Sequence, residues 1–143
     1  VILDKSADLS TAIPPLVFAA VGTAGQRCTT LRRLIIHESI YEKTISSLKH
    51  AYSQIKIGDP SDPKNHVGPL IDKDAVKSYE NTITKIKELN GNIIFGGKAI
   101  EGKGYFVEPT IVEANPGWPI VAQETFAPIL YVMPFKTREE AIE

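Results

Sequence analysis

The single cysteine of the chain, Cys28, lies in a segment whose composition suits nucleophilic chemistry. Gly22 and Gly25 precede it, and because neither has a Cβ they let the backbone turn sharply and approach another group closely. A thiol on such a bend can point into a cleft, where the positive charge of Arg27 would favour the thiolate. Backbone N–H groups around Cys28 could hold an oxyanion. A free cysteine is also commonly a small buried hydrophobic residue, so the local sequence leaves both interpretations open.

The segment before Cys28 is predicted to be helical in two parts. Ser6 or Asp8 is suited to cap a short polar helix, because the side-chain oxygen of either residue can accept a hydrogen bond from the first backbone N–H groups. Proline does not fit inside a regular helix, so the helix should stop and restart at Pro14-Pro15. Residues 16–21 would then form a buried helical stretch that leads to the cysteine bend.

Three further helices are predicted after the cysteine. Ser39 begins a capping-box pattern, and the helix that it opens should end near Gly58. Asp72 caps a second helix, which should stop at Asn90-Gly91, and Thr137 caps a third.

Five strands complete the predicted fold. They are expected at residues 1–3, 31–37, 92–95, 105–112 and 129–135. Pro109 interrupts the fourth of these strands and so places it at an edge or a bend of the sheet. Strands that alternate with helices imply an α/β fold with a largely parallel sheet flanked by helices.

Composition argues against several classes of function. The chain has 143 residues, of which 43% are hydrophobic and 23% charged, and its net charge of −1 gives no basis for binding nucleic acid or a membrane. One cysteine excludes an internal disulfide and suits a cytoplasmic protein, or a mitochondrial one in a eukaryote. His37, His50 and His66 lack metal-ligand spacing, so no metal site is expected. The chain starts at Val1 inside a predicted strand, so we expect it to be a piece of a longer protein.

Two separated motifs carry a resemblance to a known family. Gly25-Gln26-Arg27-Cys28, with Phe18-Ala19-Ala20 before it, resembles the catalytic cysteine signature of the aldehyde dehydrogenase superfamily. Residues 124–128, Glu-Thr-Phe-Ala-Pro, are similar to the Glu-x-Phe-Gly-Pro motif of that family, with Ala127 where glycine is usual. The residues around Cys28 are most similar to the antiquitin branch, which oxidises α-aminoadipate semialdehyde in lysine breakdown. Further matches extend the resemblance over nearly the whole chain, at residues 33–39, 67–71, 95–97 and 108–110.

The resemblance implies roles for three residues. Cys28 would be the nucleophile that attacks the aldehyde, Glu124 would hold the hydroxyls of the nicotinamide ribose, and Phe126 would wall the nicotinamide ring. The implied cofactor is NAD, with NADP as an alternative, and the implied substrate is a small-molecule aldehyde. The extra methyl of Ala127 would lie beside the cofactor pocket.

Arg27 is the residue that bears on the choice of substrate. Its guanidinium could grip the carboxylate of an acidic semialdehyde with two parallel hydrogen bonds. A structural salt bridge is the alternative role for an arginine in this segment, and Arg32 and Arg33 are better suited to it.

The resemblance also implies that residues 1–143 form part of a catalytic domain. The cofactor-binding domain, the general-base glutamate and the oxyanion asparagine of the family lie upstream of the matched residues, so the fragment alone should be inactive. The intact protein should pack the rest of its polypeptide against this segment and form a homo-oligomer, either a dimer or a tetramer.

Two other classes of function stay open. A cysteine hydrolase or acyltransferase would need a histidine presented to Cys28, which the spacing of His37 and His66 does not suggest. A non-catalytic structural or oligomerisation module would keep Cys28 packed in a core. Thiol reactivity separates the classes, because a buried thiol resists alkylation whereas a thiol in a cleft does not.

Overall fold

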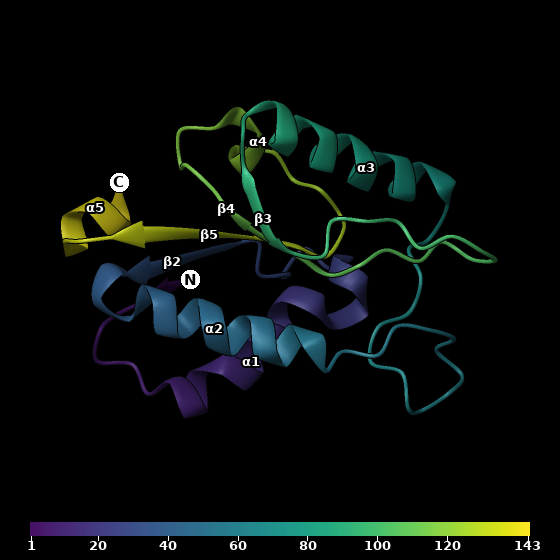
Figure 1. The fold of residues 1–143 in the computed structure, drawn as a ribbon, viewed down its shortest axis with the longest axis horizontal. Helices are drawn as coiled ribbons and strands as arrows, with labels where there is room; N and C mark the ends of the chain where they lie inside the picture. Colours follow the sequence, from purple (N-terminus) through teal and green to yellow (C-terminus); the bar gives the residue numbers. More distant parts are fainter.

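A five-stranded sheet in the order β1-β2-β5-β4-β3 carries the fold (Figure 1). The computed structural model describes residues 1–143, and its strands are Ile2–Leu3 (β1), Arg33–His37 (β2), Asn92–Phe95 (β3), Thr110–Glu113 (β4) and Ile129–Phe135 (β5). The first four strands in this order run parallel to one another, and β3 alone runs antiparallel to its neighbour β4. The predicted α/β fold with a largely parallel sheet is confirmed.

Helices cover both faces of this sheet (Figure 1). Helices α1 (Leu9–Val21) and α2 (Tyr41–Ser53) lie on one face, whereas α3 (Lys73–Glu88) and the short α4 (Pro119–Ala122) lie on the other. A last helix, α5 (Arg138–Ile142), follows β5; a tight left-handed turn, Gly22–Gly25, follows α1, and a 3₁₀ turn, Glu38–Ile40, follows β2. None of the helices has the length and apolar character that a bilayer-spanning segment needs.

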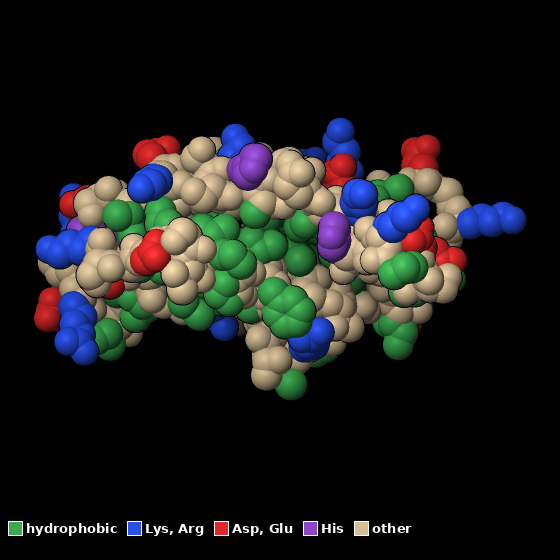
Figure 2. All heavy atoms as spheres, turned by 90° about the horizontal axis from the view of Figure 1, so that it is seen from below, with side chains coloured by type: hydrophobic (Ala, Val, Ile, Leu, Met, Phe, Trp, Pro, Cys, Tyr) green, Lys and Arg blue, Asp and Glu red, His purple; other side chains and the backbone are tan.

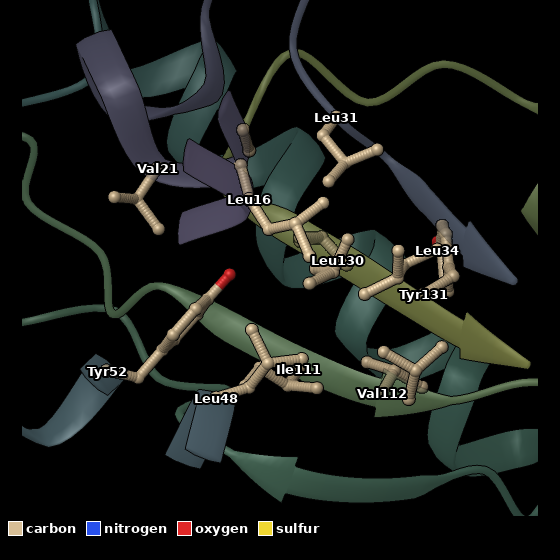
Figure 3. Packing of buried hydrophobic residues seen from close by; sticks show 14 of the residues in the cluster. Leu16, Val21, Leu31, Leu34, Leu48, Tyr52, Ile111, Val112, Leu130 and Tyr131 are labelled. Carbon is tan, nitrogen blue, oxygen red and sulfur yellow. The ribbon is translucent and has the colours of Figure 1, made fainter. Parts of the chain in front are cut away.

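The core between α1, α2 and the sheet is apolar. Figure 3 shows Leu16 and Val21 of α1 and Tyr52 of α2 directed toward Ile111 of β4 and Leu130 of β5. All five side chains are buried. Their burial fixes α1 against the sheet, and α1 ends where the cysteine segment begins.

Helix α1 does not stop at Pro14-Pro15, which corrects the prediction of two helical parts. Asp8 is its N-cap, as one of the two predicted alternatives, and accepts a hydrogen bond from the Ser10 N–H at 3.0 Å. The two prolines lack the N–H groups that would bond the carbonyls of Ser10 and Thr11. Both of those residues are exposed, so water can solvate the freed carbonyls and the helix continues.

The capping box at Ser39 is not formed, and α2 begins two residues later at Tyr41. The Ser39 hydroxyl lies 2.9 Å from Nδ1 of His37, and the same Nδ1 accepts from the Ser39 N–H at 3.2 Å. Ser39 is thus held by the residue before the turn and does not cap the helix. Helix α2 also ends at Ser53, ahead of the predicted end near Gly58.

The fourth predicted strand is shorter than expected and lies inside the sheet. β4 begins at Thr110 and pairs with both β5 and β3, so of the two predicted alternatives, an edge or a bend, the edge is wrong, and Pro109 marks the strand's boundary. Proline has no N–H to donate, and pairing with the β5 segment starts with the Thr110 N–H, which donates to the Pro128 carbonyl at 2.8 Å. The predicted caps Asp72 and Thr137 are confirmed, as are the bounds 92–95 and 129–135.

Tyr79 anchors α3 on the start of β4, and its buried hydroxyl makes the free energy of unfolding fall at alkaline pH. Its hydroxyl donates to the Glu108 carbonyl at 2.9 Å and lies 2.7 Å from Thr110 Oγ1, and burial raises the pKa of Tyr79 to about 12. The unfolded chain releases this proton near pH 10, so the contribution is complete below that pH and falls by about 1.4 kcal/mol per pH unit up to the folded pKa. We expect Tyr79→Phe to flatten the alkaline loss of stability.

Urea unfolding at about pH 9 and about pH 11 would measure this effect. The matched control is Tyr105→Phe, which removes the hydroxyl of an exposed tyrosine. An equal loss of stability in wild type and Tyr79→Phe would contradict the assignment.

Candidate active site

The backbone before Cys28 turns through three successive left-handed residues. Thr23, Ala24 and Gly25 have φ values of 55°, 52° and 71°. Such a conformation costs roughly 1–2 kcal/mol for each residue that carries a Cβ, so packing must hold it in place. Ala24 is buried, and the Gln26 N–H closes the turn on the Thr23 carbonyl at 3.1 Å. The turn leaves Cys28 exposed, as expected for a thiol in a cleft and not for one packed in a core.

Gly25 brings the two motifs into direct contact. A Cβ at this position would lie 2.3 Å from the carbonyl carbon of Ala127 and 2.5 Å from the nitrogen of Pro128, so no larger residue fits. The predicted close approach is confirmed for Gly25. Gly22 has an ordinary φ of −54°, and a Cβ there would meet nothing closer than the Arg27 guanidinium at 3.5 Å.

Ala127 does not line the hollow that holds Cys28. The residue is fully buried and belongs to the hydrophobic core. Its backbone, and not its side chain, is what meets the cysteine segment at Gly25.

Gln26 fixes the cysteine segment to a loop that sequence reasoning did not connect with it. Its amide nitrogen donates to the carbonyls of Thr23 (3.1 Å) and Pro69 (3.3 Å), and its amide oxygen accepts from the Ile71 N–H at 2.9 Å. Residues 67–71 matched the family pattern, but nothing in the order of residues indicates that they lie behind the cysteine.

One hollow holds Cys28 together with Glu124. We call it the Cys28 hollow; it has a volume of about 370 Å³. It is lined by Val1, by Ala19 of α1, by the residues from Cys28 into β2, and by the end of α4 with the two residues after it: Val1, Ala19, Cys28, Thr29, Thr30, Leu31, Arg32, Arg33, Ala122, Gln123 and Glu124. The structure therefore places the predicted nucleophile and the predicted ribose-binding residue on one surface.

Parallel pairing of β2 and β5 explains why these residues meet. Arg33 pairs with Tyr131, and the Tyr131 N–H donates to the Arg32 carbonyl at 2.8 Å. Neighbouring parallel strands begin at the same edge of a sheet, so the residues that precede β2 and those that precede β5 lie side by side. The Cys28 hollow lies at this edge.

Free backbone donors surround the thiol. The Arg27 N–H donates to Thr30 Oγ1 at 3.2 Å, and the Thr30 N–H returns a bond to the Arg27 carbonyl at 3.1 Å. These bonds fix the turn around Cys28. The N–H groups of Cys28 and Thr29 donate no hydrogen bond within the chain, so both can serve an oxyanion.

No histidine lines the Cys28 hollow. Nδ1 of His66 accepts from the Lys56 N–H at 3.0 Å, and His37 is engaged with Ser39. Neither of these rings lines the hollow with Cys28, as the base of a cysteine hydrolase would. No group of three or more His, Cys, Asp or Glu side chains is placed to hold a metal ion.

Arg32 joins both motifs and makes the salt bridge that was predicted for it or for Arg33. Its guanidinium lies 3.2 Å from Glu124 Oε1 and 5.1 Å from the centre of the Phe126 ring. The side chain of Arg32 is 11% exposed, whereas that of Glu124 is 56% exposed. The Phe126 ring is also half exposed and does not line the Cys28 hollow.

Arg27 lines a second hollow, separate from the one that holds Cys28 and Glu124. Its Nε donates to Thr23 Oγ1 at 2.7 Å, and its guanidinium lies 5.3 Å from the centre of the Phe18 ring. This Arg27 hollow has a volume of about 500 Å³ and shares no residue with the Cys28 hollow. Figure 2 shows hydrophobic side chains gathered in a band on the face that α1 and α2 form. The hollow is lined by residues of α1, α2 and the cysteine segment, with His66: Pro14, Val17, Phe18, Val21, Gly22, Thr23, Arg27, Ala51, Gln54, Ile55 and His66.

Comparison with known proteins identifies relatives over the full chain. The model of the aldehyde dehydrogenase family matches residues 1–143. The alpha-aminoadipic semialdehyde dehydrogenase of Rattus norvegicus is 50% identical over 144 residues, covering 100% of this chain and 27% of the relative. Aldehyde dehydrogenase family 7 member A1 of Brassica napus is 49% identical, covering 99% of this chain and 29% of the relative. The chain thus spans just over a quarter of the length of these relatives.

Solved structures agree with the sequence relatives. Lactaldehyde dehydrogenase from Escherichia coli superposes with a TM-score of 0.94 at 34% identity, covering 99% of this chain and 30% of that one. The NAD⁺ complex of an aldehyde dehydrogenase from Bacillus cereus superposes equally well, with a TM-score of 0.94 at 30% identity, covering 99% of this chain and 29% of that one.

Proposed function

The chain belongs to the aldehyde dehydrogenase family, and from that premise we propose that it is the cysteine-bearing part of an NAD(P)-dependent dehydrogenase that oxidises an acidic semialdehyde. The observation that carries the proposal is the placement of Cys28 and Glu124 on one hollow, with Arg32 between the two motifs. The substrate is proposed to be α-aminoadipate semialdehyde, because a relative named alpha-aminoadipic semialdehyde dehydrogenase is 50% identical to the chain.

Cys28 would perform the covalent steps. Its thiolate adds to the carbonyl carbon, and the C–S bond forms as the carbonyl oxygen becomes an oxyanion. The backbone N–H of Cys28, which has no acceptor in the chain, is available to that oxyanion. Loss of hydride leaves a thioester on Sγ, and water then cleaves the thioester to a carboxylic acid. We propose that the base for this water and a second oxyanion donor come from the rest of a longer polypeptide.

The residues near Cys28 fit the nicotinamide end of a dinucleotide. Glu124 uses Oε1 for Arg32, and its Oε2 accepts no hydrogen bond in the chain, so this oxygen can accept hydrogen bonds from ribose hydroxyls. The half-exposed ring of Phe126 offers a flat apolar surface to a nicotinamide ring. A bound nicotinamide would accept the hydride that the substrate loses. The choice between NAD and NADP is not encoded in these contacts.

Arg27 is proposed to bind the carboxylate of the substrate from the Arg27 hollow. Its Nε is occupied by Thr23, whereas its two terminal nitrogens donate no hydrogen bond within the chain. A guanidinium with both terminal nitrogens free can hold a carboxylate through a pair of charge-assisted bonds.

Replacing Arg27 by alanine should therefore weaken selection of acidic aldehydes. We expect KM for α-aminoadipate semialdehyde to rise about 10- to 100-fold, the value of a lost charge-assisted pair, and KM for a neutral aldehyde of similar length to stay the same. Arg27→Lys keeps the positive charge without the planar fork of donors, so its KM for α-aminoadipate semialdehyde should lie between those of wild type and Arg27→Ala. Equal KM changes for both aldehydes would remove Arg27 from substrate recognition.

The proposed function itself is tested with the full-length protein. Reduction of NAD or NADP would be followed with α-aminoadipate semialdehyde and with a neutral aldehyde. Preference for the acidic substrate supports the proposal. Turnover of neutral aldehydes alone would support an aldehyde dehydrogenase but reject the proposed substrate.

We expect the isolated segment of 143 residues to be inactive. The expected homo-oligomer and the expected cytoplasmic location stay predictions.

A further inference from the structure

We propose that Arg32 is a positioning residue: it holds the carboxylate of Glu124 in a fixed place relative to the backbone around Cys28. The inference rests on the proposed function, because it assigns Glu124 to the nucleotide and Cys28 to the aldehyde. No role beyond a structural salt bridge was expected for Arg32 from the sequence.

The guanidinium of Arg32 contacts the cysteine segment on both sides of the thiol. It donates to the carbonyls of Arg27 at 3.0 Å and of Thr30 at 3.2 Å, and it lies 3.5 Å from the carbonyl of Gly25. These carbonyls belong to the turn whose N–H groups at Cys28 and Thr29 are free. The orientation of that turn, and so of its donors, depends on this side chain.

The same guanidinium contacts the second motif at three consecutive residues. It lies 3.2 Å from Glu124 Oε1, 3.5 Å from the Thr125 carbonyl and 5.1 Å from the centre of the Phe126 ring. Thr125 is 93 residues from Arg32 in the sequence, so one side chain connects two distant loops. Five N–H donors in a planar fork allow this number of partners, whereas an ammonium group on a lysine has three donors at one point.

Burial decides which partner orients the other. Arg32 is 11% exposed and held by backbone carbonyls, so its position is set by the fold. Glu124 is 56% exposed and its side chain makes no other salt bridge or hydrogen bond, so its carboxylate takes the direction that Arg32 imposes. Arg32 therefore acts on the nucleotide through Glu124 and does not need to touch it.

A double-mutant cycle on nucleotide affinity tests this role in the full-length protein. The dissociation constant for NAD would be measured by fluorescence, without aldehyde, for wild type, Arg32→Ala, Glu124→Ala and the double variant. We expect each single variant to weaken binding about 3- to 30-fold and the double variant to bind no worse than Glu124→Ala, because the effect of Arg32 passes through Glu124. Arg32→Lys should recover only part of the loss.

Two further measurements separate positioning from a general loss of structure. The control Arg138→Ala removes an exposed arginine on α5, at the opposite end of β5 from Glu124, and should bind NAD like wild type. The rate at which an alkylating reagent modifies Cys28 should change in Arg32→Ala and not in Arg138→Ala. If Arg32→Ala does not fold, Arg32→Lys and Arg32→Gln replace it in the cycle.

Additive losses in the cycle, or unchanged NAD binding in Arg32→Ala, would overturn the inference. If the wild type does not reduce the nucleotide with any aldehyde, the proposed function fails and this inference falls with it. An active wild type with an additive cycle rejects only the role of Arg32.

Discussion

Replacing Cys28 by alanine is expected to abolish aldehyde-dependent reduction of the nucleotide by the full-length protein. We expect kcat/KM to fall about 10⁴-fold or more, because the proposed covalent steps need the Cys28 thiolate as the nucleophile. Cys28 is the single cysteine of the chain, and its thiol lies exposed on a hollow that also holds Glu124. The measurement is the initial rate of NADH or NADPH formation at several aldehyde concentrations.

Binding of NAD provides the control for this variant. The thiol is not among the groups that contact Glu124, so affinity for NAD should stay within about twofold of wild type. Cys28→Ser should be nearly as inactive as Cys28→Ala, since a serine hydroxyl is a far weaker nucleophile without an adjacent base. If Cys28→Ala still turns over aldehyde, Cys28 is not the nucleophile and the proposed mechanism is rejected.

Gly25→Ala should be the most damaging substitution outside the nucleophile. The new methyl would need to occupy space 2.3 Å from the carbonyl carbon of Ala127, and the residue would have to keep a φ of 71°. The left-handed conformation costs roughly 1–2 kcal/mol and overpacking roughly 1–3 kcal/mol, so we expect a loss of about 3 kcal/mol in the free energy of unfolding. Activity should fall as well, because separating these two backbones moves Cys28 relative to Glu124.

Substitutions at two other glycines separate the cost of the backbone conformation from the cost of the steric contact. Gly102 has a φ of 127°, and a Cβ added there would meet nothing within 4 Å, so Gly102→Ala reports the cost of conformation alone. Gly22→Ala measures the cost of adding a methyl where φ is −54° and the nearest group, the Arg27 guanidinium, lies at 3.5 Å. Thermal unfolding and kcat/KM would be measured for all three variants. A loss in Gly25→Ala no larger than that in Gly102→Ala would show that the contact with Ala127 does not hold the motifs together.

Features that depend on neighbours along the chain were readable from the sequence. Asp8, Asp72 and Thr137 cap helices because each has a short acceptor side chain just before a helical segment. Residues 129–135 form a strand because a run of apolar residues is buried on both faces of a sheet. The α/β class follows from the alternation of such segments.

Features that depend on solvent or on competing partners were not readable in the same way. The helix passes through Pro14-Pro15 because the carbonyls that lose their partners belong to exposed residues, and exposure is decided by the fold. Ser39 caps nothing because the ring of His37 competes for its hydroxyl. Residues 105–109 fall outside β4 because Pro109 has no N–H to continue the ladder, and Val107 forms only an isolated bridge with Ala99.

The order of residues alone specifies which chemical groups the site has: one thiol, a neighbouring guanidinium, and a glutamate and phenylalanine in a second motif. How these groups lie depends on the tertiary fold. Parallel pairing of β2 with β5 aligns the segments that precede these strands, which brings Arg32 to Glu124 and Gly25 to Ala127. Arg27 and Cys28 are neighbours in the chain, yet they line separate hollows. Contacts across about 90 residues arise from strand register, a property that no local pattern of residues encodes.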